Sequence, residues 1–215
     1  MKTIIALVSA LLCASAWADV AVVNIWSPLP GKGPQLFENG MEAKAIHEKM
    51  GASASIASDQ DGNMHYVVVF DSWEELGRFQ DSAATNKEWQ AFWQRVSMEP
   101  TADLLRSYLI DNPVVAKAQP ASMVFSWDVD PGQTPAFLAL CDEARKIHER
   151  LGASVGINID ELGDVHYELT FANWEAWGKY QTRVAADEEW NQFWARASRE
   201  PVAELIKVWR VTAVQ

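Results

Sequence analysis

Cysteine is nearly absent from this chain of 215 residues, which contains only Cys13 and Cys141. Because Cys13 falls in a segment that we expect to be removed, the remaining chain has one thiol and forms no internal disulfide, so its core must hold it together. Cys141 stands at helical spacing from Phe137 and Ala144, which favours a small buried apolar side chain over a nucleophile. The lack of a C-x-x-C motif argues against the common thiol oxidoreductases.

Long apolar runs, basic clusters and the common catalytic motifs are also missing. No segment after residue 18 reaches the roughly 20 apolar residues that span a bilayer. The net charge is −11, and an acidic chain without a basic cluster repels phosphate backbones, so we expect no nucleic-acid partner. The absence of a glycine-rich phosphate loop and of a Ser/His/Asp order argues against nucleotide enzymes and common hydrolases. We expect no permanent cofactor.

The N-terminus has the features of a secretory signal peptide. Lys2 supplies a positive charge, residues 4–13 form a short apolar run, and the small residues that follow end at Ala18. We expect cleavage after Ala18 and a periplasmic or secreted chain with no membrane insertion. The alternative is a lipoprotein anchored through Cys13, which the bulky Leu12 before it disfavours.

The remaining 215 − 18 = 197 residues contain one sequence pattern twice. When residues 20–110 are aligned with 121–211 at a constant offset of 101, 34 of the 91 pairs are identical and no gap is needed. We therefore expect two modules of the same fold, residues 19–111 and 121–215, joined by a linker at 112–120 that contains two prolines. All four histidines belong to the repeat, as the pairs His47/His148 and His65/His166.

Each half predicts the order strand, helix, strand, strand, helix, strand. In the first half we expect strands at 20–26, 54–58, 64–70 and 104–110, and helices at 35–50 and from 72 onward, the second helix being interrupted near 84–86. Gly51 follows the first helix, where a glycine favours a left-handed cap. Asp61-Gly62 predicts a hairpin, and Ser72 with Glu75 predicts a capping box.

This element order is that of a ferredoxin-like module, a four-stranded antiparallel sheet with both helices on one face. Two such sheets packed face to face would cover each other, so we predict an α+β fold, an intramolecular pseudo-dimeric α/β barrel in a monomeric chain. The element order, the helix opening Trp73-Glu74-Glu75-Leu76 and the segment Lys87 to Trp93 resemble the dimeric α/β barrel superfamily. The resemblance is greatest to its NIPSNAP-like and antibiotic-biosynthesis-monooxygenase-like branches.

The resemblance implies a pocket between the helices and the sheet of each half. In the family's cofactor-free oxygenases such pockets act on aromatic polyketides with tryptophan and polar neighbours. Here the lining residues would be Trp26, His47 and Tyr66, repeated as Trp127, His148 and Tyr167. His47 and His148 are candidate acid/base groups because the pKa of histidine lies near neutral, but no complete oxygenase constellation matches and none is assigned as catalytic. The alternative is a favourable interaction with the helix dipole, strongest when the histidine is charged.

A second polar set is expected between the two sheets. Strand alternation places His65 and His166 opposite to the apolar face of their strands, and Glu168 shares the face of His166. A buried polar group costs about 1–3 kcal/mol unless it is partnered, so these side chains should bond each other, water or a ligand. Imidazole and carboxylate also suit a metal. Because no H-x-x-x-H spacing occurs, we favour paired structural histidines and assign no metal.

Tryptophan is abundant, and most tryptophans fall at helical spacing. Trp73, Trp89 and Trp93, with their second-half equivalents, predict packing of the helices on the sheet, with a ligand-stacking cage as the alternative. Trp177 and Trp209 replace Leu76 and Tyr108, so the two halves differ in apolar volume.

Three functions stay open on the sequence alone. The first is an exported protein that binds a small apolar or aromatic ligand. Its contact residues would be Trp26, His47, His65, Tyr66, Trp127, His148, His166, Tyr167 and Glu168. The second is a cofactor-free monooxygenase or isomerase that uses His47 or His148 in the same pocket. The third is a non-catalytic structural or interaction module. A cavity that contacts His47 or His148 favours the first two, and a filled interior favours the third.

Overall fold

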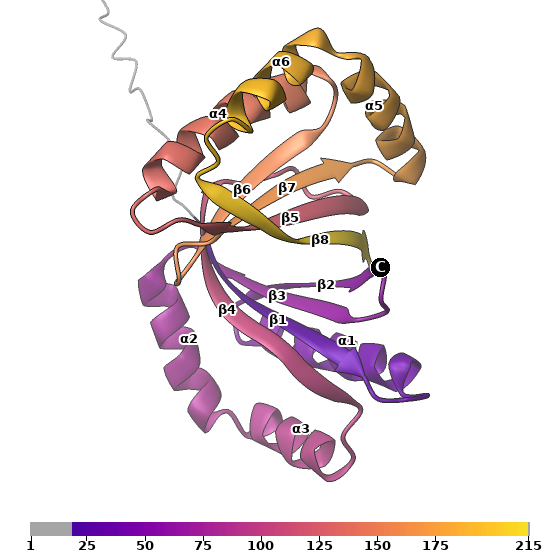
Figure 1. Ribbon diagram of the computed structural model, residues 1–215. Coiled ribbons are helices and arrows are strands. Elements are labelled where there is room, and N and C mark those ends of the chain that lie inside the picture. The colour runs from indigo at the N-terminus through magenta and orange to yellow at the C-terminus, as the bar shows by residue number, and fades with distance from the viewer. Residues whose placement is uncertain (1–18, 215) are drawn as a thin grey trace, which may run out of the picture.

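The computed structural model describes residues 19–214 (Figure 1). The signal peptide predicted for residues 1–18 therefore lies outside the described residues. Within the described residues, no helix combines the length and the apolar character that a bilayer crossing requires.

The two halves contain the same elements in the same order. The first half comprises β1 (Asp19–Pro28), α1 (Gly33–Lys49), β2 (Ser53–Asp59), β3 (Met64–Phe70), α2 (Trp73–Thr85), α3 (Lys87–Met98) and β4 (Ala102–Val114). The second comprises β5 (Ala121–Val129), α4 (Thr134–Arg150), β6 (Ser154–Asp160), β7 (Val165–Phe171), α5 (Trp174–Ala186), α6 (Glu188–Ala197) and β8 (Ala203–Ala213). The predicted α+β class and element order are confirmed.

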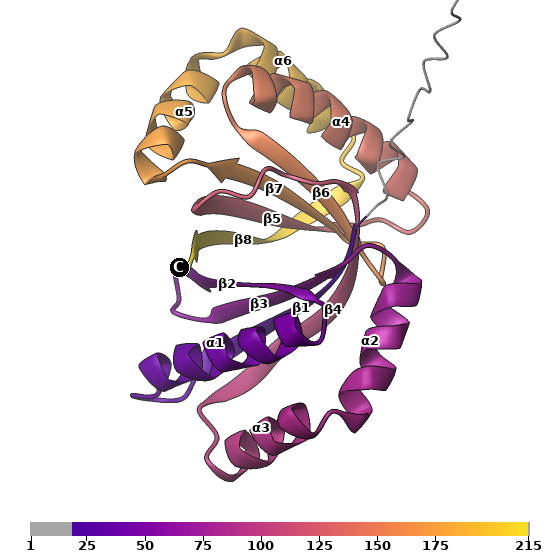
Figure 2. The same ribbon diagram turned by 180° about the vertical axis from the view of Figure 1, so that it is seen from behind.

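The eight strands form one closed antiparallel barrel in the order β1-β3-β2-β8-β5-β7-β6-β4. The sequence predicted two sheets packed face to face as a barrel, and the pairing of the sheet edges was not predicted. Strands β2 and β8 pair along one seam and β4 and β6 along the other, because a free strand edge exposes unpaired N–H and C=O groups that a neighbouring edge satisfies. The helices cover the outside of the barrel, α1–α3 over one half and α4–α6 over the other (Figures 1 and 2).

The core has three parts, which follow from the alternation of side chains along each strand. Tyr66, Val68 and Phe70 of β3 pack outward against the first-half helices, as predicted, and the second half has an equivalent outer core. The opposite strand faces form the barrel interior around Val23, Ile25 and Ile110. Each half can therefore hold a cavity between helices and sheet, separate from the barrel interior.

The local sequence signals act largely as expected. Asn86 separates α2 from α3, and Ser72 accepts a hydrogen bond from the Glu75 amide at 3.2 Å. The side chain of Glu75, however, accepts from the Asp71 amide, so the predicted capping box lacks its reciprocal bond to Ser72. Strand β4 continues past residue 110 to Val114, because Asp111 and Val114 pair with β6.

Gly51 ends α1 in the left-handed conformation, with φ of +92°. The Gly51 amide donates to the Glu48 carbonyl, and the Ala52 amide donates to the His47 carbonyl, both at 3.0 Å. This pair of bonds is a Schellman motif. It fixes the last turn of α1 and therefore the position of His47.

Replacing Gly51 by alanine is expected to lower the free energy of unfolding by about 1 kcal/mol, because a Cβ is disfavoured at positive φ. Gly77 provides the matched control. It lies inside α2 with open space around its Cα, so Gly77→Ala should raise stability by about 0.5–1 kcal/mol. Urea unfolding of both variants measures the difference, and equal effects of the same sign would contradict the assignment of the cap.

Candidate functional site

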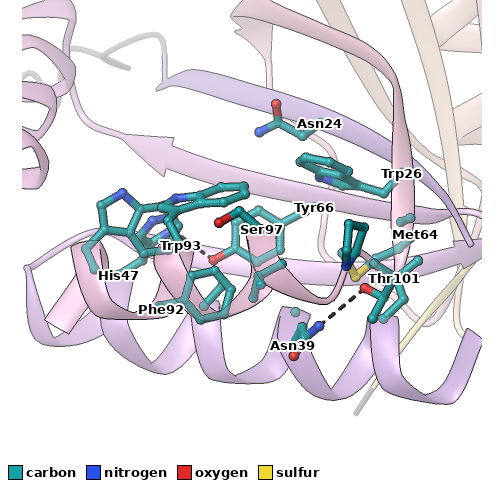
Figure 3. A pocket seen from close by; sticks show the side chains of 17 residues that line it. Asn24, Trp26, Asn39, His47, Met64, Tyr66, Phe92, Trp93, Ser97 and Thr101 are labelled. Atoms are coloured by element: carbon teal, nitrogen blue, oxygen red, sulfur yellow. Dashed lines mark hydrogen bonds between the residues drawn. The ribbon is translucent and has the colours of Figure 1, made fainter. Parts of the chain in front are cut away.

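A cavity of about 290 Å³ lies in the first half between α1, α3 and the outer face of the sheet (Figure 3). Three of the predicted residues, Trp26, His47 and Tyr66, line it together. The other lining residues come mainly from the two helices and from the start of β4: Asn24, Leu36, Asn39, Gly40, Ala43, Met64, Trp89, Phe92, Trp93, Val96, Ser97, Pro100, Thr101 and Ala102. The volume is that of a site for a small molecule.

His47 is held at one end of the cavity by bonds and ring contacts. Its Nδ1 lies 2.8 Å from the Tyr66 hydroxyl. The ring centroids of Trp89 and Phe79 lie 4.3 and 5.1 Å from that of the imidazole. Because the Schellman motif also fixes its backbone, His47 has one well-defined orientation.

Burial determines the protonation state of His47. The side chain is almost completely buried, and this burial lowers its pKa to about 4. Burial likewise raises the pKa of the Tyr66 hydroxyl, with the charge of Glu48 adding to the effect. At neutral pH the pair consists of a neutral imidazole and a neutral phenol. The near-neutral pKa and the charged interaction with the helix dipole that were expected from the sequence were therefore wrong. At rest His47 is a neutral imidazole with one ring N–H, and its other ring nitrogen can accept a proton.

The side chains that line the far end of the cavity are polar and uncharged, and the nearby Arg95 guanidinium lies outside the lining and pairs with Glu42. The Asn39 amide nitrogen donates to the Thr101 hydroxyl at 3.3 Å, and the guanidinium of Arg95 donates to the Asn39 side-chain oxygen at 3.3 Å. Figure 3 shows this pair well separated from His47, with Tyr66 and Phe92 among the rings between them. At neutral pH none of the 17 lining residues, all in the described range, is ionised. The arrangement suits a flat, neutral ligand with a hydrogen-bonding group at each end.

The second half keeps the same three residue types but arranges them differently. His148 has its pKa lowered to about 4 by burial, as His47 does. Its Nδ1 is hydrogen-bonded to the hydroxyl of Tyr180 on α5, not to that of Tyr167. The buried hydroxyl of Tyr167 has no hydrogen-bond partner among the described residues. Trp127 contacts Phe137, with ring centroids 5.4 Å apart.

His65 and His166 lie in the barrel interior, where strand alternation placed them, and not in the cavity. Each contacts an aromatic ring of the other half: His65 packs edge-on to Trp209, and His166 stacks on Tyr108 at 5.0 Å between centroids. The Nε2 atom of each histidine lies within 3.2 Å of a buried carboxylate, Asp59 for His65 and Asp160 for His166. The two histidines are paired with carboxylates, and not with each other.

The sequence analysis missed these two aspartates. Asp59 also accepts the amides of Asp61 and Asn63, and Asp160 accepts those of Leu162 and Asp164. Both close the hairpin that follows their strand. An aspartate occurs at this position in both halves, which could have indicated a shared role. It was not singled out because an aspartate before a glycine turn is ordinarily only a turn residue.

Burial lowers the pKa of His65 and of His166, and the adjacent carboxylates oppose this effect. Burial by itself would raise the pKa of Asp59, but hydrogen bonds from Asn63, His65 and the hairpin backbone lower it overall. Ser126 lies 2.9 Å from His166 Nδ1, which completes a Ser126–His166–Asp160 chain that the sequence order did not indicate. All three side chains are buried, so the chain connects strands and offers no accessible nucleophile.

Glu168 is partly buried in the barrel interior and is not part of the cavity. Burial raises the pKa of its carboxyl, and a hydrogen bond with Ser122 opposes the shift. The nearby glycine at 156 leaves room for this carboxyl and for Ala116 of the linker, because a Cβ there would lie 3.3 and 3.1 Å from them.

Several further sequence predictions can be compared with the structure. Cys141 is buried, and its pKa is raised to about 12 by burial, so it is a core side chain as predicted. Trp93 and Trp194 contact Trp26 and Trp127 of the sheet, with ring centroids 6.2 and 6.4 Å apart, as the predicted helix–sheet packing requires, although they are 40% and 47% exposed. Trp73 is 51% exposed, so the core packing predicted for it was wrong. In the described chain, no three His, Cys, Asp or Glu side chains form a group able to hold a metal ion.

No protein-family model matches the sequence, and no curated protein is similar to it. Solved structures are similar in fold. Two proteins described as "putative monooxygenase", from Fusobacterium nucleatum and Lactobacillus acidophilus, align with TM-scores of 0.66 and 0.63 and sequence identities of 10% and 9%. The alignments cover 93% and 91% of this chain and 94% of each of theirs. An anthrone oxidase-like protein aligns with a TM-score of 0.60 and 15% identity over 92% of both chains.

These similarities show the fold and leave the activity open, since all identities are low. The NIPSNAP-like branch stays a prediction. The chain has the fold of the dimeric α+β barrel proteins that include monooxygenase-like members.

Proposed function

We propose that the first-half cavity binds one small, planar, neutral aromatic molecule. The observation that carries this proposal is the cavity itself, about 290 Å³ in volume, with aromatic walls and polar groups but no ionised side chain. Apolar walls with a few placed polar groups are typical of small-molecule sites. The structural neighbours described as monooxygenases and as anthrone oxidase-like support a ligand of this class.

The second candidate function is oxygenation or isomerisation of that ligand, begun by removal of a proton. The observation that favours it is the neutral His47 held against Tyr66. With a pKa of about 4 this imidazole is a weak base, so the proton it accepts must come from an acidic phenolic or activated C–H group of a bound ligand, and an oxygenase would use dioxygen as the oxidant.

Two further proposals concern the whole chain. We propose that the halves arose by tandem duplication and that the barrel is an intramolecular pseudo-dimer in a monomeric chain. The gapless repeat supports this, as do the reciprocal contacts of His65 with Trp209 and of His166 with Tyr108 across the two seams. We also propose export with cleavage after Ala18, which N-terminal sequencing of the protein recovered outside the cytoplasm would test.

Binding can be tested by calorimetric titration of the mature chain with 1-naphthol, naphthalene and 1-naphthoate. We expect one equivalent of 1-naphthol to bind, and 1-naphthoate to bind at least ten-fold more weakly because the lining offers no countercharge. Trp93 and Trp194 are equivalent and similarly exposed, and only Trp93 lines the cavity. Trp93→Ala should therefore weaken binding about ten-fold, while Trp194→Ala leaves it unchanged. The proposal fails if the wild-type chain binds none of the three compounds.

Turnover is tested separately by oxygen uptake and product analysis in air with 1-naphthol. His47→Gln should abolish any turnover and His148→Gln should retain it, since only His47 contacts the cavity. Binding without turnover would support the ligand-binding function and contradict the oxygenase or isomerase function.

A further inference from the structure

The two halves offer an internal comparison of the cavity. Of the 17 positions that line it, 10 carry the same residue in the second half, including the equivalents of Trp26, His47, Tyr66 and Trp93. The seven differences are Asn24/Phe125, Leu36/Phe137, Asn39/Leu140, Gly40/Cys141, Met64/Val165, Val96/Ala197 and Thr101/Val202. The aromatic walls are thus shared. The differences include the floor at Gly40 and Met64, the remote end at Asn39 and Thr101, and Asn24 beside Tyr66.

One group of differences changes volume. A Cβ on Gly40 would lie 2.5 Å from the sulfur of Met64, so a larger residue at position 40 requires a smaller one at position 64. The second half has that combination, Cys141 with Val165, and both are buried in its core. Phe137, in place of Leu36, fills space beside Trp127. Together these exchanges add side-chain volume in the second half where the first half is open, although Ala197 in place of Val96, like Val165 in place of Met64, removes some.

The other group of differences removes polarity. Asn24, Asn39 and Thr101 are replaced by Phe125, Leu140 and Val202, which pack on the apolar core. The hydrogen bond between Asn39 and Thr101 therefore has no counterpart. Apolar side chains at these positions cannot hold the polar end of a ligand.

The unpartnered hydroxyl of Tyr167 is a second sign of closure. Tyr66 at the equivalent position bonds His47 at the cavity wall, whereas Tyr167 is 6% exposed and its hydroxyl has no hydrogen-bond partner in the described chain. A buried hydroxyl without a partner is costly. The unpartnered Tyr167 hydroxyl is therefore explained as a remnant of a cavity that this half no longer has.

We propose that the second half is a closed copy of the first-half cavity, and that Asn24, Asn39, Gly40 and Thr101 determine which ligand the open copy accepts. Gly40 provides depth, and Asn39 and Thr101 select a neutral aromatic compound with a hydrogen-bonding group at the end remote from His47. Asn24 adds a polar group on β1 beside Tyr66. This inference rests on the proposed function of the first-half cavity.

Exchanging residues between the halves tests the inference. Asn39→Leu with Thr101→Val should lower the preference for 1-naphthol over naphthalene at least five-fold, because the polar end is lost and the volume is kept. Asn39→Leu with Gly40→Cys and Met64→Val should weaken binding of both compounds at least ten-fold, because these are the residues that pack the second half. Val202→Thr is the matched control and should change neither affinity.

The reverse exchange, Phe125→Asn with Leu140→Asn and Cys141→Gly, should add a second equivalent of bound 1-naphthol. Circular dichroism checks that this variant folds. If it does not fold, the inference is judged by the two first-half exchanges alone. The inference is overturned if the wild-type chain binds 1-naphthol while both first-half exchanges leave affinity and preference unchanged. That result would leave the proposed function intact, whereas a wild-type chain that binds no compound removes the proposed function itself.

Discussion

Replacing Asp160 by alanine is expected to lower the free energy of unfolding by about 3–5 kcal/mol, because several hydrogen-bond donors lose one shared buried acceptor and each buried donor left without a partner costs about 1–3 kcal/mol. The Asp160 side chain is 1% exposed and accepts hydrogen bonds from the Leu162 and Asp164 amides. It also lies 3.2 Å from His166 Nε2 and 3.0 Å from the guanidinium of Arg106. Arg106 belongs to the other half, so one carboxylate stabilises both the β6–β7 hairpin and the seam between β4 and β6.

Chemical denaturation at pH 7.5 measures this loss. Asp142→Ala is the control, because Asp142 is exposed and pairs only with Arg145 and Lys146 of its own helix, and exposed pairs contribute little. Arg106→Met separates the two roles of Asp160, since it removes the contact across the seam and leaves the hairpin bonds. It should cost less than Asp160→Ala but more than Asp142→Ala. Similar stabilities for the Asp160 and Asp142 variants would contradict the account.

Acidification is expected to destabilise the fold by several kcal/mol between about pH 6.5 and pH 4. His47 and His148 have pKa values lowered to about 4 by burial, so the unfolded chain takes up protons in this window before the folded chain does. Their contribution is complete above the unfolded pKa of 6.5 and is lost as the pH falls towards 4. At roughly 1.36 kcal/mol per pKa unit, each histidine contributes up to about 3 kcal/mol.

Urea unfolding at pH 7.5, 5.5 and 4.5 measures this dependence. The pKa values of His65 and His166 are lowered as well, so they act in the same direction. Glu168, whose pKa is raised by burial, acts in the opposite direction and is common to the two chains compared. The variant His47→Gln/His148→Gln removes two of the four titrating histidines and should show a clearly smaller loss between pH 7.5 and 4.5, whatever its absolute stability. The lowered pKa of Asp59 acts only below 3.8, outside this window. An unchanged slope in the double variant would show that the two histidines are not buried as described.

The core of the candidate site could be predicted from the sequence because it follows from periodicity. Trp26 and Tyr66 point to the helix side of their strands, and His47 lies on the sheet-facing side of α1, so alternation and helical spacing bring the three together. Asn39, Gly40 and Thr101 could not be found in this way. The sequence does not show that such polar or small residues line a cavity, because this depends on which element packs opposite to them.

The repeat in the sequence by itself determined two copies of one module, the order of its elements and the glycine caps of its helices. It also determined which histidines occupy equivalent positions in the two halves. These features are local or periodic, so each follows from neighbours in the chain. Only the tertiary structure decided that the two sheets join at their edges, that Asp59 and Asp160 hold the interior histidines, and that the cavity is open in the first half. Those outcomes depend on contacts between residues far apart in sequence, such as Arg106 with Asp160, and on a balance of side-chain volumes such as Gly40 against Met64.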